Sequence, residues 1–425
     1  MDTDKSQSLV ENQHDEKVQA EQLQQEKLQR DVKTILSVGE EVNGADRLPA
    51  LLKNKPHKRA YDGFEPSGRM HIAQGLIRTI NVNKITSTGV KFVFWVADYF
   101  ALLNLKMGGK FDRIRKAGEL MIHIWKACGM DMSNVEFVWA SEEIQKRSAE
   151  YWALVFDIAT KVNVKRTLRC TQIMGRKDFT EKKEVASSTN PDDVQGGKDG
   201  NVVSVDGSAS GSTDGSEEVN SIPYEDMLSS MKTSQIFYPI MQCADIFFLN
   251  IDICSLGVDQ RKVNMLALEY CDMIKRKLKP IVVSHHMLSG LDGSDKMAKS
   301  NPNAAIFMDD SDKDIDSKIK QAFCEPCNIT KNPVLEYFKY IVFEKEENGV
   351  TMDVFDIETK TSTSVHFPDF ESLQQAFAKG HVHPSDLKAS IKIYLKKYLD
   401  PVREYFAKNP EADALRNEVK KFTQK

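Results

Sequence analysis

The chain has 425 residues, of which 41% are hydrophobic and 28% are charged, and its formal net charge is −4. This length suits two or three globular domains, and the charge excludes a strongly basic protein, so a nucleic-acid partner would require a local basic patch. No apolar run approaches the roughly 20 residues of a membrane span, and the N-terminus lacks signal-peptide and transit-peptide features, so we expect no membrane partner and a cytoplasmic location.

Residues 1–30 are rich in Gln, Glu, Lys and Asp. Apolar residues such as Val18, Leu23 and Leu28 recur at roughly helical spacing. We therefore expect a polar arm that is partly helical or disordered and has no catalytic role.

The stretch from Tyr61 to Gly75 predicts a strand, a turn broken by glycine and proline, and the start of a helix. Free backbone N–H groups at such a helix start favour a phosphate, and His71 can donate a hydrogen bond to developing phosphate charge. The alternative is an ordinary loop between a strand and a helix.

The next elements alternate between strand and helix patterns. Residues 90–96 are too apolar for a half-exposed strand and predict a central parallel strand buried on both faces, followed by a strand at 135–139. Helices are expected at 112–128 and 142–159. This alternation predicts an α/β fold with a doubly wound parallel sheet.

Residues 185–220 consist largely of Gly, Ser, Asp and Asn, which predicts a disordered insert. Residues 244–249 and 280–285 are expected to be buried strands, with a helix at 260–274 between them. From residue 313 onward the pattern is mainly helical.

Lys296 and Lys299 lie three residues apart on a predicted mobile loop, between Gly293 and the pair Asn301-Pro302. Two cations at this spacing can contact one polyphosphate. The seven cysteines are scattered, which indicates reduced thiols, and the pair Cys324 and Cys327 lacks a second pair for a metal site, so we predict no bound metal.

Three ordered motifs carry a family resemblance. The His-Ile-Ala-Gln segment at 71–74 and Lys-Met-Ala-Lys-Ser at 296–300 resemble the HIGH and KMSKS signatures of class I aminoacyl-tRNA synthetases. The blocks 238–245 and 257–262 are similar to those of the tyrosine-specific members of archaeal and eukaryotic type. The resemblance implies a Rossmann-like catalytic domain over 31–312 and a helical anticodon-binding domain over 313–425.

The implied reaction joins tyrosine to tRNA(Tyr) through a tyrosyl-adenylate, with ATP as a substrate that carries Mg²⁺, in a homodimer. The resemblance assigns the catalytic positions to His71, Lys296 and Lys299. The implied ATP-binding residues are Gly63, His71, Gly75, Lys296, Met297, Lys299 and Ser300. The implied tyrosine-binding residues are Tyr61, Tyr238, Gln242, Asp245 and Gln260. Arg261 is implied to contact the acceptor stem, and Asp386 to read the anticodon.

Several alternatives stay open. Gln74 replaces the second histidine of the HIGH signature, so only a neutral amide is available there. Asp386 could instead cap a helix. A tryptophan-specific relative would not need the Asp245 carboxylate, and a catalytically idle protein would not need the two lysines.

Two basic clusters are candidate tRNA contacts, at 275–279 and along the stripe of Lys388, Lys392 and Lys396. Such a charge stripe is equally compatible with a solvated helix face.

Overall fold

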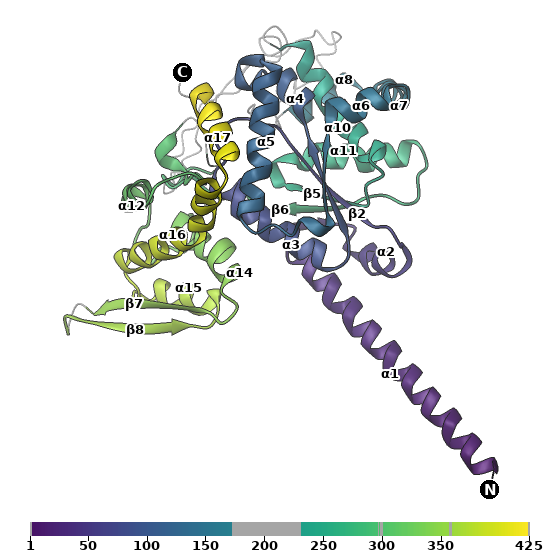
Figure 1. Ribbon diagram of the computed structural model, residues 1–425, viewed down its shortest axis with the longest axis horizontal. Helices are drawn as coiled ribbons and strands as arrows, with labels where there is room; N and C mark the ends of the chain where they lie inside the picture. Colours follow the sequence, from purple (N-terminus) through teal and green to yellow (C-terminus); the bar gives the residue numbers. More distant parts are fainter. Residues whose placement is uncertain (1, 172–230, 296, 298–300, 357–358, 424–425) are drawn as a thin grey trace, which may run out of the picture.

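The computed structural model describes residues 2–171, 231–295, 297, 301–356 and 359–423. The expected insert at 185–220 lies outside the described residues. The polar arm forms one long helix, α1 (Asp2–Leu36), which projects away from the body of the molecule (Figure 1). Its Gln, Glu and Lys residues favour helix, and of the two forms expected for the arm, the helical one extends from Asp2 onward.

A six-stranded sheet forms the centre of the protein, with the strand order β1-β6-β5-β2-β3-β4. Only β1 runs antiparallel to its neighbour. The strands are β1 (Glu41–Asn43), β2 (Arg59–Phe64), β3 (Lys91–Val96), β4 (Val135–Trp139), β5 (Ile253–Gly257) and β6 (Ile281–His285). The sequence predicted β2, β3, β4 and β6, and all four are confirmed.

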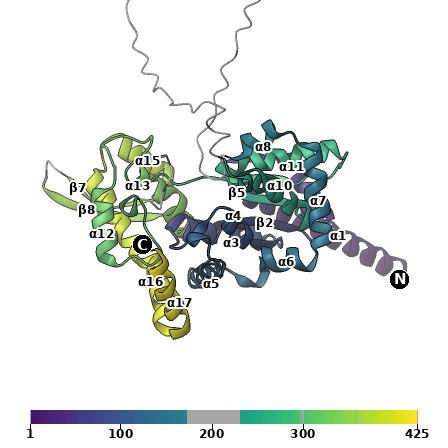
Figure 2. The same cartoon turned by 90° about the horizontal axis from the view of Figure 1, so that it is seen from above.

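Helices cover both faces of this sheet, which confirms the doubly wound fold. One face carries α4 (Asp98–Leu103), α6 (Ala140–Lys146), α7 (Ser148–Lys161), α8 (Val164–Cys170), α10 (Thr233–Phe248) and α11 (Arg261–Met273). The other carries α2 (Leu48–Asn54), α3 (Arg78–Ser87) and α5 (Phe111–Ala127). Figure 2 shows α10 and α11 on one side of β2 and β5, and α3 and α5 on the other.

Strand β3 explains how the two layers share the sheet. Phe92 and Phe94 belong to one hydrophobic core, whereas Val93 and Trp95 belong to the other. Successive side chains of a strand point to opposite faces, so a strand between two helical layers must be apolar throughout.

The rest of the chain is mainly helical, as expected, and packs against the α5 side of the sheet. It contains α12 (Asp312–Gln321), α13 (Pro333–Tyr337), α14 (Phe343–Lys345), α15 (Phe370–Ala378), α16 (Pro384–Lys408) and α17 (Pro410–Thr423). A hairpin of β7 (Val350–Asp356) and β8 (Thr361–Phe367), which the sequence pattern did not predict, lies beside α15. Helix α17 lies along α5 (Figure 1).

The predicted strand at 244–249 is wrong, because these residues complete helix α10 and its C-cap. A short apolar run does not distinguish a buried helix from a buried strand. The strand in this region is β5, which begins four residues later at Ile253. The helix predicted at 142–159 is divided between α6 and α7.

Candidate active site

The predicted tyrosine-binding residues gather where the strand order reverses, between β2 and β5. Helical connections diverge at such a point in a doubly wound sheet and leave a crevice at the carboxyl ends of the strands. Tyr61 and Gly63 lie on β2, and Gln260 follows β5 in a short 3-10 turn. The topology therefore brings two parts of the chain, about 200 residues apart, to one site.

Helix α10 supplies three more of the predicted residues. Tyr238, Gln242 and Asp245 are spaced four and three residues apart and are all buried. This spacing places them on one face of a helix. The same spacing, read from the sequence, was a signal for helix rather than strand.

Asp245 forms one end of the site. Its carboxylate is only 1% exposed, and burial raises its pKa well above the usual value, although Tyr151 and Trp95 oppose that rise. Burial and the nearby Asp245 charge likewise raise the pKa of Tyr61. A buried phenol and a buried carboxyl thus lie close together, and such a pair is suited to bond a hydroxyl group from two sides.

Two residues of this site were not predicted from the sequence. The hydroxyl of Tyr151 donates a hydrogen bond to Asp245 at 2.9 Å. Glu65, just beyond β2, accepts a hydrogen bond of 2.6 Å from the Tyr238 hydroxyl and also lies 3.4 Å from Lys106. No local pattern marks either residue, because both contacts join segments far apart in the sequence.

The Tyr238 end of the site is suited to a cationic amine. Gln242 Nε2 donates to Gln260 Oε1 at 3.1 Å, while Gln242 Oε1 is buried and has no hydrogen-bond partner among the described residues. An unpaired buried acceptor is costly unless a ligand satisfies it. Glu65 adds a negative charge that the two neutral amides lack.

The His71 segment is paired with residues 304–310, which we call the bridging segment. His71 and Phe307 form an antiparallel bridge, with hydrogen bonds from Ile72 N to Ile306 O at 2.8 Å and from Met308 N to Met70 O at 2.9 Å. The bridging segment lies shortly after the two-lysine loop in the chain. Backbone hydrogen bonds therefore tie the His71 segment to the part of the chain that follows the two-lysine loop.

Gly75 has a packing role in this arrangement. A Cβ atom on Gly75 would approach Met308 Sδ to 2.3 Å, so glycine allows the bridging segment to lie close to the helix. Met297 is buried in the hydrophobic core. Lys296, Lys299 and Ser300 lie outside the described residues.

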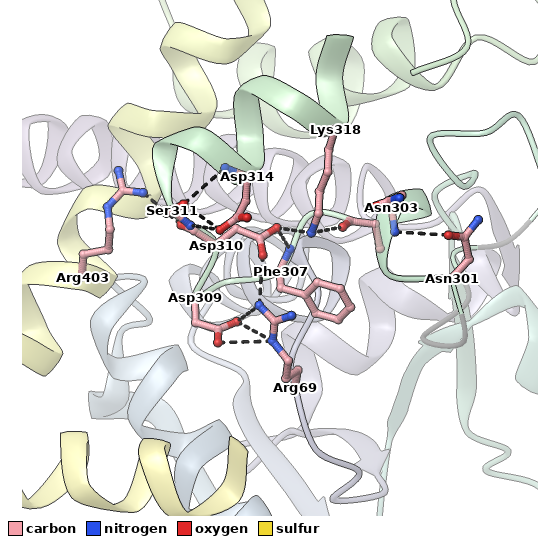
Figure 3. A network of polar contacts seen from close by, with 11 residues as sticks. Arg69, Asn301, Asn303, Phe307, Asp309, Asp310, Ser311, Asp314, Lys318 and Arg403 are labelled. Atoms are coloured by element: carbon pink, nitrogen blue, oxygen red, sulfur yellow. Dashed lines mark hydrogen bonds and ion pairs between the residues drawn. The ribbon is translucent and has the colours of Figure 1, made fainter. Parts of the chain in front are cut away.

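A polar network holds the bridging segment in place (Figure 3). Arg69 donates to Asp309 at 2.6 Å and to Asp310 at 3.0 Å. Lys318, from α12, contacts Asp310 Oδ2 at 2.6 Å and donates to the Ala305 carbonyl at 3.0 Å. Arg403, from α16, donates to the Asp310 carbonyl at 3.1 Å. The network therefore connects the segment before His71 with the C-terminal helices.

His286 lies between β6 and the two-lysine loop in the chain, and its side chain joins two other segments. Its Nδ1 lies 3.2 Å from Glu40 and its Nε2 lies 3.5 Å from Glu336, while its ring stacks on Tyr340 with a centroid distance of 4.2 Å. Burial lowers the pKa of His286, but the two carboxylates outweigh this effect, so the pKa is raised overall.

Arg261, a predicted tRNA contact, lines a cleft of about 460 Å³ beside the β5 end. Three further cations line this cleft, namely Arg166, Arg169 and Lys262. Two carboxylates, Asp259 and Glu269, also line the cleft, and Glu269 pairs with Arg166 at 2.7 Å. The four cations still outnumber the two carboxylates, and such a local excess of positive charge favours a polyanion.

Asp386 lies at the start of α16 and is 7% exposed. Its carboxylate accepts hydrogen bonds from His383 N at 3.2 Å and Phe355 N at 3.4 Å. It therefore caps the helix, in the arrangement called a capping box. Its predicted role in reading a base stays a prediction.

The two basic clusters have different surroundings. Lys388 donates to the Lys320 carbonyl and Lys396 pairs with Asp316 at 2.9 Å, so two of the three stripe lysines contact α12. Residues 275–279 precede β6, at the end of the sheet opposite the site. Neither arrangement favours the clusters as primary tRNA contacts.

The fold and site define an α/β protein that places polar side chains at a switch point, next to a histidine segment suited to phosphate. The family described as tRNA synthetases class I (W and Y) matches residues 53–187 and 216–400. The chain is 43% identical over 400 residues to Tyrosine–tRNA ligase 1, cytoplasmic, of Arabidopsis thaliana, a match that covers 93% of this chain and 90% of that relative. The chain therefore belongs to this family of class I tRNA synthetases.

Solved structures give the same result. Leishmania major tyrosyl-tRNA synthetase in complex with tyrosinol has a TM-score of 0.75 and 40% identity over 93% of this chain, and this chain spans 52% of that one. Pyrococcus horikoshii tyrosyl-tRNA synthetase complexed with L-tyrosine has a TM-score of 0.73 and 28% identity, and the match covers 92% of this chain and 99% of that one. The chain thus spans nearly the whole of the archaeal protein and about half of the Leishmania protein.

Proposed function

We propose that this chain is a tyrosine–tRNA ligase. The observation that carries the proposal is the buried pair of Tyr61 on β2 and Asp245 on α10, which lie close enough at the switch point for the Asp245 charge to raise the pKa of Tyr61. A site that hydrogen-bonds a substrate hydroxyl rejects an analogue without it, because the site's own polar groups would stay unpaired. Tyrosine fits these requirements better than phenylalanine does.

The reaction has two steps. The tyrosine carboxylate attacks the α-phosphorus of ATP, which forms tyrosyl-adenylate and releases pyrophosphate. A hydroxyl of the terminal ribose of tRNA(Tyr) then attacks the carbonyl carbon and releases AMP. The protein's part is to orient the reactants and to neutralise charge that grows on phosphate oxygens.

The residues divide between these tasks. Tyr61 and Asp245 bond the phenol, while Tyr238, Gln242 and Gln260 hold the amine, with Glu65 supplying the opposite charge. His71, Gly63 and Gly75 form the ATP side, and Met297 anchors the loop that carries Lys296, Lys299 and Ser300 toward the leaving pyrophosphate. Mg²⁺ arrives with ATP, held mainly by phosphate oxygens and water.

The C-terminal residues 313–425 form the anticodon-binding domain in this proposal, and residues 31–312 form the catalytic domain. Arg261 and its neighbours in the basic cleft receive the acceptor end of the tRNA. The relatives named cytoplasmic support a cytoplasmic location.

A homodimer is part of the proposal. Trp152 and Phe156, one turn apart on α7, are 37% and 60% exposed. Exposed aromatic residues that share a helix face are typical of protein–protein interfaces. A second copy of the chain is the partner implied by the family.

A tryptophan-specific enzyme is the nearest competing function. A tryptophanyl-tRNA synthetase from Encephalitozoon cuniculi shares the fold, with a TM-score of 0.58, but is only 14% identical. Indole offers one N–H donor and no hydroxyl, so it cannot be bonded from two sides by Asp245 and Tyr61 as a phenol can, and the buried pair favours tyrosine.

The test is ATP–pyrophosphate exchange with tyrosine, tryptophan or phenylalanine, followed by aminoacylation of tRNA(Tyr). Exchange that depends on tyrosine and is far weaker with the other two is expected. Stronger exchange with tryptophan would reassign the substrate, and exchange with none of them would leave a protein without this activity.

A further inference from the structure

The Asp245 carboxylate accepts a hydrogen bond from a residue that is not part of the proposed tyrosine site. It is almost completely buried, and it is contacted by Tyr151, which comes from α7 rather than from the strand or helix that carry the other phenol-binding residues. The hydroxyl of Tyr151 donates to Asp245 Oδ1 at 2.9 Å. Tyr151 is itself 0% exposed, so water does not compete for this bond.

The orientation of Tyr151 is fixed by packing. Its ring lies edge-on to Phe248 with a centroid distance of 5.0 Å. Among the described residues, the Tyr151 hydroxyl has one other hydrogen-bond acceptor nearby, the Met241 carbonyl, at the longer distance of 3.4 Å. A hydroxyl has one proton to donate, and the shorter contact directs that proton to Asp245.

This bond has two consequences for the carboxylate. It restrains rotation of the carboxylate plane, and it uses only one of the acceptor sites of the carboxylate, so that others remain for a ligand beside the smaller contribution of Trp95. It also favours the ionised form, which burial disfavours. An ionised carboxylate accepts a hydrogen bond from a phenol, whereas a protonated one competes as a donor.

We propose that Tyr151 is a positioning residue for amino-acid selection, whose hydroxyl holds Asp245 as an oriented hydrogen-bond acceptor for the substrate phenol. The inference rests on the proposed function. It assigns to α7 a part in selecting tyrosine over phenylalanine that no motif in the sequence indicates.

The test compares Tyr151→Phe with Tyr270→Phe. Tyr270 is also buried, and its hydroxyl donates to Asp157 of the same helix α7 at 2.6 Å. Each change removes one hydroxyl bond that holds α7 to a neighbouring helix and keeps the ring. Of these two tyrosines, only Tyr151 contacts Asp245. The control therefore separates loosening of α7 from an effect on the carboxylate.

For Tyr151→Phe we expect kcat/KM for tyrosine in ATP–pyrophosphate exchange to fall roughly tenfold or more, the size of a hydrogen bond to a charged group. The kcat/KM for phenylalanine and the KM for ATP should change much less. The ratio of kcat/KM for tyrosine to that for phenylalanine should therefore fall. The acid limb of the pH profile for tyrosine should move to higher pH, because the variant loses a bond that favours the carboxylate. Tyr270→Phe should leave all of these unchanged.

A second comparison uses the Asp245→Ala background, where Tyr151→Phe should have little further effect, because a positioning residue acts through its partner. Unchanged discrimination and pH profile in Tyr151→Phe, or an equal change in Tyr270→Phe, would overturn the inference and leave the proposed function standing. A wild-type protein without tyrosine-dependent exchange would overturn both.

Discussion

Replacing Lys318 by methionine tests whether the network around the bridging segment holds the protein together. Methionine keeps most of the stem and removes the charge. The Lys318 and Asp310 side chains are 9% and 2% exposed, with 2.6 Å between the charged atoms. Removal of one partner from a buried ion pair costs about 3–5 kcal/mol, because the other charge stays buried.

The structure places the expected loss at the lower end of that range. Asp310 would keep its hydrogen bonds from Arg69 at 3.0 Å and from Phe307 N at 2.8 Å, so its charge would not be fully uncompensated. The Ala305 carbonyl would lose the amine that it now accepts from at 3.0 Å. We therefore expect Lys318→Met to lower the free energy of unfolding by about 3 kcal/mol.

Urea unfolding monitored by circular dichroism measures this loss, with Lys408→Met as the control. Lys408 pairs with Glu404 at 2.9 Å, but these side chains are 73% and 64% exposed. A pair in this setting contributes less than about 1 kcal/mol. Because the bridging segment pairs with His71, KM for ATP should also rise more than KM for tyrosine in Lys318→Met. Equal unfolding midpoints for the two variants would refute the network's role.

Four further outcomes are expected. Lys296→Ala and Lys299→Ala should slow adenylate formation far more than they weaken tyrosine binding, and an equal loss of tyrosine affinity would contradict their assignment to the transition state. Asp386→Ala should cost about 1 kcal/mol of stability through the lost cap. It should also impair charging of tRNA with guanine at the first anticodon position, while ATP–pyrophosphate exchange stays intact. An equal loss of charging for tRNA altered at that base would show that Asp386 acts as a helix cap and does not read the base. The raised pKa of His286 means that its stabilisation is complete below its unfolded pKa of about 6.5 and is lost as pH rises through the folded value; His286→Gln should therefore flatten the decrease in Tm between pH 6 and 8, and an unchanged slope would refute this. Deletion of residues 187–216 should leave Tm and exchange nearly unaltered, as their composition predicts, whereas a large loss of either would show a packed segment.

Strands β2, β3, β4 and β6 and the order of the motifs were readable from the sequence because they depend on local pattern. The apolar run at β3 predicts a strand buried on both faces, and the glycine-broken turn before His71 predicts a strand followed by a helix. The error at 244–249 arose where apolar character alone was used, although the spacing of Tyr238, Gln242 and Asp245 already indicated a helix.

Contacts between distant segments were not readable in the same way. Glu65 meets Tyr238 across 173 residues, and Tyr151 meets Asp245 across 94. A tyrosine on α7 has the same helical spacing whether its hydroxyl bonds a catalytic-site carboxylate or a backbone carbonyl. The fold decides between these two roles, because it determines which helix packs against which.

The two carboxylates of the site show how this packing sets chemistry. Burial raises the pKa of Asp245, and the hydrogen bond from Tyr151 opposes this rise. The carboxylate that Tyr151 holds is therefore suited to accept a hydrogen bond from a neutral phenol. Glu65 keeps 16% of its side chain exposed and lies 3.4 Å from Lys106, at the end of the site where the proposed function places the cationic amine. A neutral hydroxyl and a charged ammonium are the two polar ends of tyrosine that the adenylation step leaves intact. In the proposed function, one end of the substrate meets an enclosed acceptor and the other meets a partly exposed carboxylate. This arrangement leaves the third polar group of tyrosine, its own carboxylate, to react with ATP on the His71 side of the switch point.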